Sequence, residues 1–427
     1  MSRTLEHFET ITQIPHCSHE AQSLRDYIEE FALSCGYSVD IDSAGNILIY
    51  RGSPHLCLQA HYDMVCMGRA PKIETYIEDG WMMARDSSLG ADNGIAIAMM
   101  MSLMESGYEL EFLLTADEEV GLVGAMALEF DLQSRYMLNL DSEDEAEVYI
   151  GCAGGADIVG RYNGELVDSS GECYEISVRG LSGGHSGVDI DKDIPSATKL
   201  LAEYLHNHDI SELVTIYAGE RSNSIPANAV AIIRSTKTLE SIELVECRRL
   251  DETPQILSYG ADIIGLLHRF RHGVHSFNEE LNIPQSSINL AIVTSDERGG
   301  VTIESSARGM SIDSLESVTS YAVELLGQYG FTTDIRDRYP AWRPDINPLT
   351  DITIGEMQKV FGTSRTTAIH AGLECGVISK IYPHISIASI GPTIQYPHST
   401  RERVDIHSVE RTEQVLRAII DRIESVR

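Results

Sequence analysis

The chain has 427 residues and carries 65 Asp and Glu against 32 Lys and Arg, so its formal net charge is −33. This charge argues against nucleic acid and anionic membranes as partners, because both would be repelled. With 43% hydrophobic and 23% charged residues the composition is that of a globular protein, and the length predicts two domains.

The first third of the chain predicts alternating helices and strands. Apolar residues recur at helical spacing over residues 1–35, with a break near Pro15, and a Met- and Ala-rich helix is expected at 94–105. Short apolar runs predict strands at 46–50, 56–60, 111–115 and 136–140. Buried strands separated by helices favour an α/β domain with a mixed, largely parallel sheet.

The pattern changes after about residue 155. Alternating stretches at 173–179 and 229–233 predict half-buried antiparallel strands, and helices are expected at 195–207 and 313–329. Two prolines at 339–344 then precede a return to α/β character, with a helix at 349–360 and a strand at 385–390. We therefore expect a discontinuous α/β domain, 1–155 and 341–427, interrupted by an α+β domain at 156–340.

Side chains that can bind metal follow several of these strands, and one opens the Met-rich helix. They are His61, Asp63, Asp92, Glu118, Glu119, Asp141 and His398. Taken alone, an acidic stretch such as 117–119 is common in a solvated loop. In open α/β sheets, however, ligands bind beyond the carboxyl ends of the strands. Acidic and histidine side chains at successive strand ends therefore predict one common site.

Imidazole and carboxylate ligands suit two divalent metal ions, zinc first, with manganese or cobalt as alternatives. A pair of ions needs a bridging ligand, and Asp92 has two carboxylate oxygens for that purpose. We expect His61 and Asp141 to bind one ion, and His398 and Glu119 to bind the other.

Two more carboxylates are expected to support this centre. Asp63 lies two residues after His61 and can accept a hydrogen bond from its imidazole. Glu118 and Glu119 are adjacent, and neighbouring side chains in extended backbone point apart. One of them can therefore bind an ion while the other acts as a general base.

These residues lie in a series of motifs between residues 58 and 406: LQAHYDMV, SLGADNGIAIAM, LLTADEEVGLVGA, LNLDSEDEAEVYIGCAGG, RGLSGGHSG, AIHAGLECG and GPTIQYPHSTRERVDI. The set resembles the co-catalytic zinc peptidases of the aminoacylase and carboxypeptidase superfamily, and most of all the aminoacyl-histidine (Xaa-His) dipeptidases. The resemblance implies a zinc-binding catalytic domain and a smaller inserted lid domain that often forms a homodimer. It also implies the ligand set given above, with Glu118 as the catalytic base and Asp63 as the catalytic HxD aspartate.

The resemblance further implies residues that strand ends do not reveal. His185 matches a catalytic lid histidine that contacts the scissile carbonyl, although it could also be a loop histidine held among glycines. Arg308 matches an arginine that binds the substrate carboxylate. His370 and Glu374 match a stretch that lines the substrate pocket, although both could instead be structural.

The expected reaction is hydrolysis of small dipeptides, Xaa-His dipeptides first. A related deacylase, or another dipeptidase or aminopeptidase, is the alternative among enzymes. An inactive metal-binding scaffold would lack a ligand or the base, and none is missing. A glycosidase with paired carboxylates would leave His61 and His398 without a function.

Cysteines and targeting signals favour the cytoplasm. The eight cysteines form no CxxC pair, and a chain of this length needs no disulfide framework, so a reducing compartment is expected. The first 20 residues contain no apolar signal segment, and the longest apolar run, 95–104, is too short for a bilayer.

Overall fold

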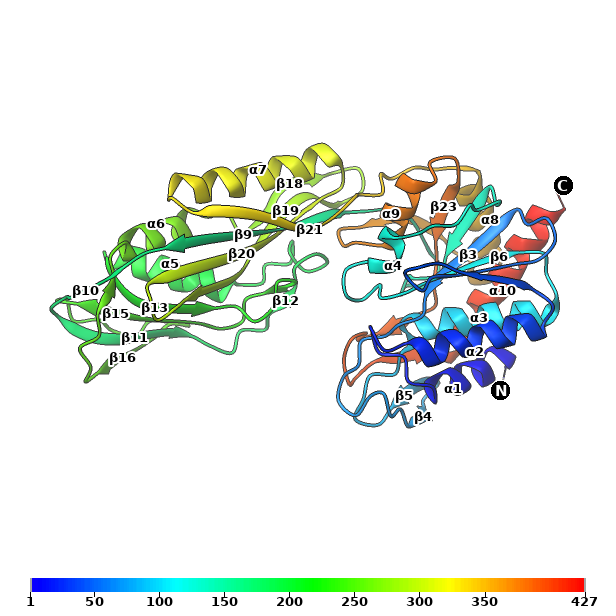
Figure 1. Ribbon diagram of the computed structural model, residues 1–427, viewed down its shortest axis with the longest axis horizontal. Helices are drawn as coiled ribbons and strands as arrows, with labels where there is room; N and C mark the ends of the chain where they lie inside the picture. The colour runs from blue at the N-terminus through cyan, green and yellow to red at the C-terminus, as the bar shows by residue number, and fades with distance from the viewer. Residues whose placement is uncertain (1, 426–427) are drawn as a thin grey trace. The chain divides into compact units, whose positions relative to one another are not determined.

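The computed structural model describes residues 2–425, and this part of the chain divides into two compact units. Unit 1 contains the described residues up to Cys152, the segment Trp342–Ala368, and the described residues from Leu373 onward. Unit 2 contains Ala153–Ala341 together with the short segment Ile369–Gly372. In Figure 1 the blue, cyan and red parts of the ribbon belong to unit 1, and the green and yellow parts belong to unit 2.

The main sheet of unit 1 is parallel at its centre and antiparallel toward its sides, with the order β1-β2-β6-β3-β7-β23-β8-β22. The parallel pairs join β3 to β6, β3 to β7, and β7 to β23. The predicted α/β fold with a mixed sheet is therefore confirmed. The strands are β1 (Ser38–Ile41), β2 (Ile47–Tyr50), β3 (Leu56–His61), β6 (Glu111–Thr115), β7 (Tyr136–Asn139), β8 (Glu147–Cys152), β22 (Arg365–Ile369) and β23 (Ser386–Ser389).

Alternation along the strands gives this sheet two different faces. Leu56, Leu58 and Ala60 of β3 belong to the apolar core, whereas Gln59 and His61 point to the opposite face. Helices with residues in the same core are α1 (Arg3–Thr12), α2 (Gln22–Ser34), α3 (Ala91–Ser106), α8 (Pro348–Phe361) and α10 (Ile406–Glu424). The shorter helices α4 (Val123–Met126) and α9 (Glu374–Ile381) contact each other.

A small antiparallel sheet in unit 1 has the order β24-β25-β5-β4. Its strands are β4 (Thr75–Glu78), β5 (Trp81–Ala84), β24 (Ile394–Gln395) and β25 (Arg403–Asp405). The turn between β24 and β25 carries His398. This sheet therefore anchors a histidine that lies beyond the main sheet in the sequence.

Unit 2 is built on an antiparallel sheet with the order β16-β11-β15-β13-β19-β20-β9-β21, in which β18 pairs with β19. Its core residues alternate along the strands, so one face packs against α5 (Ala197–Asn207), α6 (Gly260–Arg269) and α7 (Ile312–Gln328). The strands are β9 (Gly154–Asn163), β11 (Glu172–Val178), β13 (Glu212–Ala218), β15 (Ala229–Ser235), β16 (Glu246–Leu250), β18 (Gly273–Asn278), β19 (Ile283–Ser295), β20 (Gly300–Gly309) and β21 (Thr332–Tyr339).

Unit 2 also contains two short strand pairs. β10 (Leu166–Val167) pairs with β17 (Ile256–Leu257), and β12 (Gly184–His185) pairs with β14 (Ser224–Ile225). The second pair places His185 within hydrogen-bonded backbone rather than in an irregular loop.

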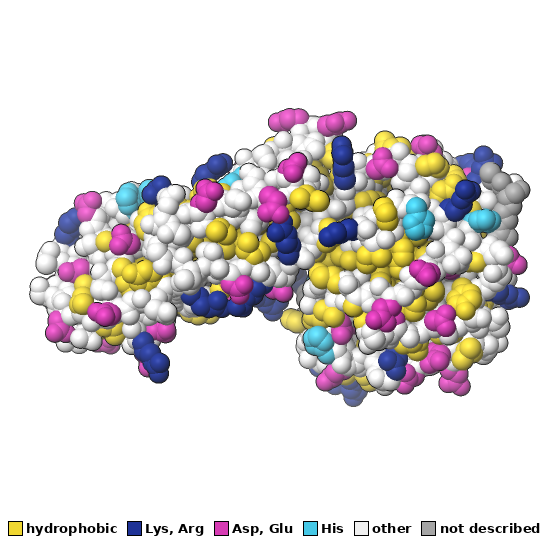
Figure 2. Space-filling view, turned by 45° about the horizontal axis from the view of Figure 1, so that its top comes forward, with side chains coloured by type: hydrophobic (Ala, Val, Ile, Leu, Met, Phe, Trp, Pro, Cys, Tyr) yellow, Lys and Arg dark blue, Asp and Glu magenta, His cyan; other side chains and the backbone are white. Residues whose placement is uncertain are grey.

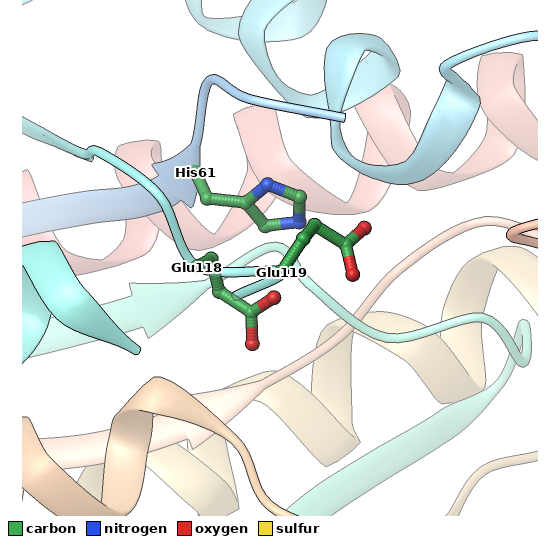
Figure 3. Close-up of side chains that lie close together, drawn as sticks. All are labelled: His61, Glu118 and Glu119. Atoms are coloured by element: carbon green, nitrogen blue, oxygen red, sulfur yellow. The ribbon is translucent and has the colours of Figure 1, made fainter. Parts of the chain in front are cut away.

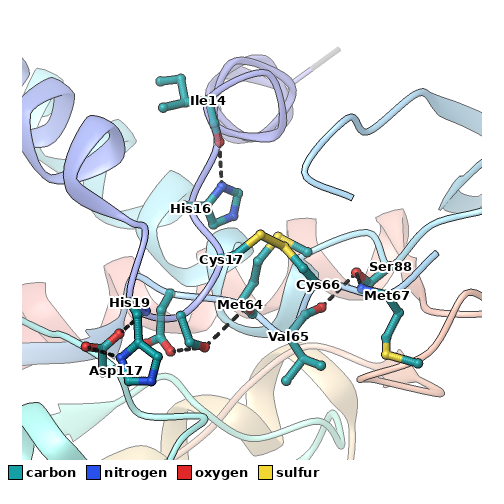
Figure 4. The surroundings of a disulfide bond; sticks show 12 residues. Ile14, His16, Cys17, His19, Met64, Val65, Cys66, Met67, Ser88 and Asp117 are labelled. Atoms are coloured by element: carbon teal, nitrogen blue, oxygen red, sulfur yellow. Dashed lines mark hydrogen bonds and ion pairs between the residues drawn. A yellow bond between two sulfur atoms is a disulfide. The ribbon is translucent and has the colours of Figure 1, made fainter. Parts of the chain in front are cut away.

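A disulfide joins Cys17 and Cys66, whose Cα atoms are 5.5 Å apart (Figure 4). From the sequence we expected no need for a disulfide and did not anticipate this pair, which is 49 residues apart in the sequence. Backbone bonds from Met64 N to His16 O and from Ser18 N to Met64 O hold the two segments side by side. Such a long-range contact leaves no local spacing pattern from which it could be predicted.

Two further observations concern the helices and the surface charge. None of the helices within residues 2–425 is long and apolar enough to cross a bilayer. On the face drawn in Figure 2, acidic side chains are scattered over both units with Lys and Arg among them. The negative charge on this face is therefore spread out rather than gathered in one patch.

Candidate metal centre

The parallel strands of unit 1 bring most of the predicted metal-binding residues to one edge of the sheet. β3, β6 and β7 are parallel neighbours, so their carboxyl ends open on the same side. His61 is the last residue of β3, Glu118 and Glu119 lie just beyond β6, and Asp141 lies just beyond β7.

Asp92 lies between the two predicted histidine ligands. Its Oδ1 atom is 3.1 Å from His61 Nε2, and its Oδ2 atom is 3.0 Å from His398 Nε2. His61 Nε2 is also 3.4 Å from Asp141 Oδ1, and His398 Nε2 is 2.9 Å from Glu119 Oε1. The Nε2 atom of each histidine therefore lies within 3.4 Å of Asp92 and of one further carboxylate.

The described residues contain three groups of potential ligands: one is formed by His61, Glu118 and Glu119, and the other two overlap with each other at Asp92. The ligand atoms of His61, Asp92 and Asp141 lie within 4.8 Å of one another, and so do those of Asp92, Glu119 and His398. Asp92 belongs to both groups and presents a different oxygen to each histidine. One carboxylate is therefore close to both histidines, through separate oxygens.

Asp63 connects His61 to the segment that carries the two glutamates. His61 Nδ1 lies 2.9 Å from the Asp63 backbone oxygen and 3.5 Å from its carboxylate Oδ1. The same Oδ1 accepts a hydrogen bond from Glu118 N at 2.9 Å, while Oδ2 accepts one from Ser18 Oγ at 2.7 Å. Asp63 therefore orients the imidazole mainly through its carbonyl and uses its carboxylate to hold the backbone of Glu118.

Glu118 and Glu119 extend their carboxyl groups in different directions near the His61 ring (Figure 3). Glu119 reaches His398, as described above. Burial and the charge of Glu119 raise the pKa of Glu118 well above its ordinary value. Burial and the charge of Asp92 raise the pKa of Glu119 to about 7. The two glutamates therefore have different neighbours. This agrees with the expectation that adjacent side chains point apart.

The electrostatics of this cluster fit divalent cations. Burial alone would lower the pKa of His61, but Asp141, Asp63 and Asp92 outweigh it and raise that pKa well above its ordinary value. Against the same effect of burial, Asp92 and Glu119 raise the pKa of His398 to about 11. The crowded carboxylates thus attract positive charge, and this donor set of imidazole and carboxylate is one that zinc, manganese or cobalt accepts.

Glu374 lies in unit 1 but away from open surface. Its side chain is fully buried, and its Oε2 atom accepts hydrogen bonds from Gln59 Nε2 at 2.5 Å and Thr115 Oγ1 at 2.6 Å. Gln59 in turn accepts a hydrogen bond from Asn139. Burial raises the pKa of Glu374 to about 7. The structure places this residue in a polar layer behind the strand ends rather than among the potential metal ligands.

His185, Arg308 and His370 lie together in unit 2. A Cβ atom on Gly187 would be 3.1 Å from His185 Cε1, 3.2 Å from Arg308 Nε and 2.6 Å from His370 O. Gly187 therefore sits among the three residues, and its missing side chain is what allows them to approach. His370 belongs to this unit through the segment Ile369–Gly372.

The cluster in unit 2 combines a guanidinium with two imidazoles. Arg308 donates to Tyr339 Oη at 2.9 Å and to Ser186 Oγ at 3.4 Å. Burial and the charge of Arg308 lower the pKa of His370 to about 3, so His370 is neutral at physiological pH. The Nδ1 atom of His185 accepts bonds from Gly187 N and Val188 N. In the neutral ring its proton is therefore on Nε2, where it can be donated.

One residue near the centre was not anticipated from the strand pattern. Glu402 follows His398 by four positions, and its carboxylate accepts hydrogen bonds from the backbone N–H groups of residues 89–92. It lies inside the quoted stretch GPTIQYPHSTRERVDI. The presence of a charged residue in this stretch was the one sign of a polar role. Nothing in the stretch indicates that its partners are the backbone N–H groups of residues 89–92.

Comparisons with known proteins identify relatives of this chain. Residues 57–422 match the protein family described as "Peptidase family M20/M25/M40". The chain is 33% identical to the cytosol non-specific dipeptidase of Escherichia coli (strain K12), over 94% of this chain and 93% of that protein. It is similar to the crystal structure of aminoacylhistidine dipeptidase from Vibrio alginolyticus, with a TM-score of 0.81, 28% identity, and coverage of 98% and 96% of the two chains. The aminopeptidase PepT of Bacillus cereus ATCC 10987 shares the fold, with a TM-score of 0.61, 17% identity, and coverage of 98% and 97%.

Proposed function

The chain belongs to peptidase family M20/M25/M40 and is a metal-dependent peptidase, and we propose that it cleaves small dipeptides, Xaa-His dipeptides among them. The observation that carries this proposal is the position of Asp92, whose two oxygens face His61 and His398 separately. Two curated or solved relatives support the substrate class, since one is named a non-specific dipeptidase and the other an aminoacylhistidine dipeptidase.

We propose that two divalent ions bind at this centre, with zinc as the first candidate and manganese or cobalt as alternatives. His61 and Asp141 would hold one ion, Glu119 and His398 the other, and Asp92 both. The chemistry that such ions supply when bound is a lower pKa for a water molecule and polarisation of the scissile carbonyl.

Glu118 is the proposed general base. It is a carboxylate beside the predicted ligands that the assigned coordination leaves free, so it can accept a proton from the attacking water. As the water oxygen bonds to the carbonyl carbon, Glu118 holds this proton, and it then delivers it to the nitrogen as the C–N bond breaks. Asp63 keeps Glu118 in place through the bond from Glu118 N to its Oδ1 atom.

The cluster of unit 2 is proposed to bind the rest of the substrate. Arg308 has a guanidinium suited to the terminal carboxylate of a dipeptide. The Nε2–H group of His185 is suited to donate to the scissile carbonyl oxygen. His370, held by Ser287 at 2.7 Å, would line the same subsite, and Glu374 would support the centre from behind.

His185→Ala is expected to lower kcat by about 10²–10³-fold, because one donor to the developing oxyanion is lost. Metal content should stay normal, since the predicted ligands all lie in unit 1. Steady-state kinetics and elemental analysis check both statements. His206→Ala, at an exposed histidine of the same unit, is the control and should keep full kcat. A normal kcat for His185→Ala would mean that the histidine only shapes its own turn.

A substrate panel tests the proposed function. Xaa-His dipeptides, other dipeptides, tripeptides and N-acetyl amino acids are compared with the metal-loaded protein. We expect the highest kcat/KM for dipeptides with a free α-amine, including Xaa-His. Preference for N-acetyl amino acids would identify a deacylase instead. No hydrolysis of any compound, with metal bound, would favour the inactive scaffold.

Assembly and location are also proposals. We propose a discontinuous catalytic domain, 1–155 and 341–427, and an inserted lid domain, 156–340, that forms a homodimer. A cytoplasmic location is proposed from the name of the Escherichia coli relative. The Cys17–Cys66 disulfide is an observation against a reducing compartment.

A further inference from the structure

The carboxylate of Glu402 binds the backbone that leads into α3. Its Oε2 atom accepts hydrogen bonds from Leu89 N at 2.7 Å and Gly90 N at 3.0 Å. Its Oε1 atom accepts hydrogen bonds from Ala91 N at 2.8 Å and Asp92 N at 3.2 Å. Both oxygens are therefore used twice, and the side chain is only 2% exposed.

No side chain of α3 itself caps this segment. Its flanking residues are held from outside the helix, since Ser88 Oγ donates to Val65 O and Asn93 Nδ2 donates to Leu140 O. Gly90 precedes α3 with a φ of 72° and has no side chain that could cap the helix. A Cβ atom there would lie 2.9 Å from Met64 Sδ, so a side chain at this position would require Met64 to move and would also be strained by the positive φ. Asp92 has φ −85° and ψ 103°, which is not helical. The helix itself therefore does not determine where the Asp92 side chain points, and Glu402 supplies the missing acceptors.

The same carboxylate links the two loops that meet at the candidate metal centre. Glu402 is four residues after His398, and Glu402 N donates to Ser399 O at 3.2 Å within that turn. Asp92 N is one of the donors to Glu402, while Asp92 Oδ2 faces His398 Nε2 at 3.0 Å. Asp92 and the turn that carries His398 are therefore joined twice, once through the Asp92 side chain and once through the Glu402 carboxylate.

We propose that Glu402 is a positioning residue that fixes Asp92 as the bridge between the two metal positions. It touches neither the predicted ions nor the substrate and acts through the backbone of residues 89–92. The inference rests on the proposed metal centre and adds to it a requirement that ligand chemistry alone does not give. An Asp92 carboxylate released from this restraint would still be an anion, but its two oxygens would no longer be held toward both histidines.

Glu402→Gln is the most direct test. The change replaces one oxygen by an NH₂ group, which would face two backbone N–H donors that have no other acceptor there. We expect metal affinity to fall by about 10–100-fold, as for other residues that hold metal ligands. Titration of the metal-free protein with Zn²⁺ or Mn²⁺ against a competing chelator measures this. The visible spectrum of the Co²⁺-loaded protein should change as well, because it reports the coordination.

Glu111→Gln is a matched control. Glu111 is another buried glutamate of unit 1, and its oxygens accept bonds from Gln133 N at 2.8 Å and Ser134 N at 2.9 Å. It lies at the end of β6 that is remote from Glu118. This variant should lose thermal stability, but it should keep the metal affinity and the Co²⁺ spectrum of the unchanged protein.

Glu402→Asp keeps the negative charge on a shorter side chain and covers the case in which Glu402→Gln does not fold. We expect a metal affinity between those of the unchanged protein and Glu402→Gln. The proposal is overturned if every folded Glu402 variant binds metal as tightly as Glu111→Gln and has the same Co²⁺ spectrum. These readouts need no substrate. If the unchanged protein binds metal but hydrolyses no dipeptide, the proposed function is contradicted, while the inference about Glu402 still stands.

Discussion

Glu118→Gln is expected to lower kcat by at least about 10²-fold while the protein keeps its metal ions. The amide has nearly the same shape as the carboxylate, but it cannot accept the proton of the attacking water. It also cannot deliver a proton to the leaving nitrogen. KM should change little, because the lost interaction belongs to the transition state. Steady-state kinetics and elemental analysis of the same preparation measure both quantities.

Glu119→Gln is the comparison that separates the two neighbours. Glu119 Oε1 lies 2.9 Å from His398 Nε2, and a neutral amide is a poor replacement for an anionic ligand. This variant should therefore lose metal at the position shared with His398. If Glu118→Gln loses metal and Glu119→Gln keeps it, then Glu118 is the metal ligand and Glu119 is the general base. Full activity in both variants would mean that neither glutamate takes part in catalysis or in binding a required metal ion.

Asp92→Ala is expected to release both metal ions and to abolish dipeptide hydrolysis. The reason is that one carboxylate belongs to both ligand groups, so its removal takes a donor from each ion at once. The unchanged protein should contain about two divalent ions per chain and lose activity to a chelator, with recovery on adding metal back. Elemental analysis before and after chelation gives the stoichiometry.

Asp26→Asn is a suitable control for Asp92→Ala, because Asp26 is exposed on α2. It should keep both ions and full activity. Asp141→Ala offers a sharper comparison, since Asp141 belongs only to the group of His61 and should cost one ion. Activity that survives complete metal removal from the unchanged protein would contradict the metal-dependent reaction. Two ions retained by Asp92→Ala would contradict the bridge.

The sequence by itself determined the elements and much of the fold. Helical spacing and apolar runs are local properties, so they predicted the helices on either side of Pro15 and the strands at 56–60 and 111–115. The parallel arrangement followed from buried strands separated by helices. Because parallel strands end at a common edge, it also followed that His61, Glu119 and Asp141 would come close together.

The sequence did not reveal contacts whose partners are far apart or carry no side-chain signal. Cys17 and Cys66 are 49 residues apart and join only because the chain folds back between them. His370 lies in unit 2 through a segment of four residues, which is too short to have a periodicity. The position of each oxygen of Asp92 likewise depends on how two loops meet.

Glu402 illustrates the physical limit most directly. Its partners are backbone N–H groups of residues 89–92, and a backbone donor is the same for nearly every amino acid. No letter in the sequence can therefore mark them as a binding site for a carboxylate. The sequence determined which side chains are available as ligands, because chemistry is a property of each residue. Only the tertiary structure decided how they are held, because orientation depends on the path of the backbone around them.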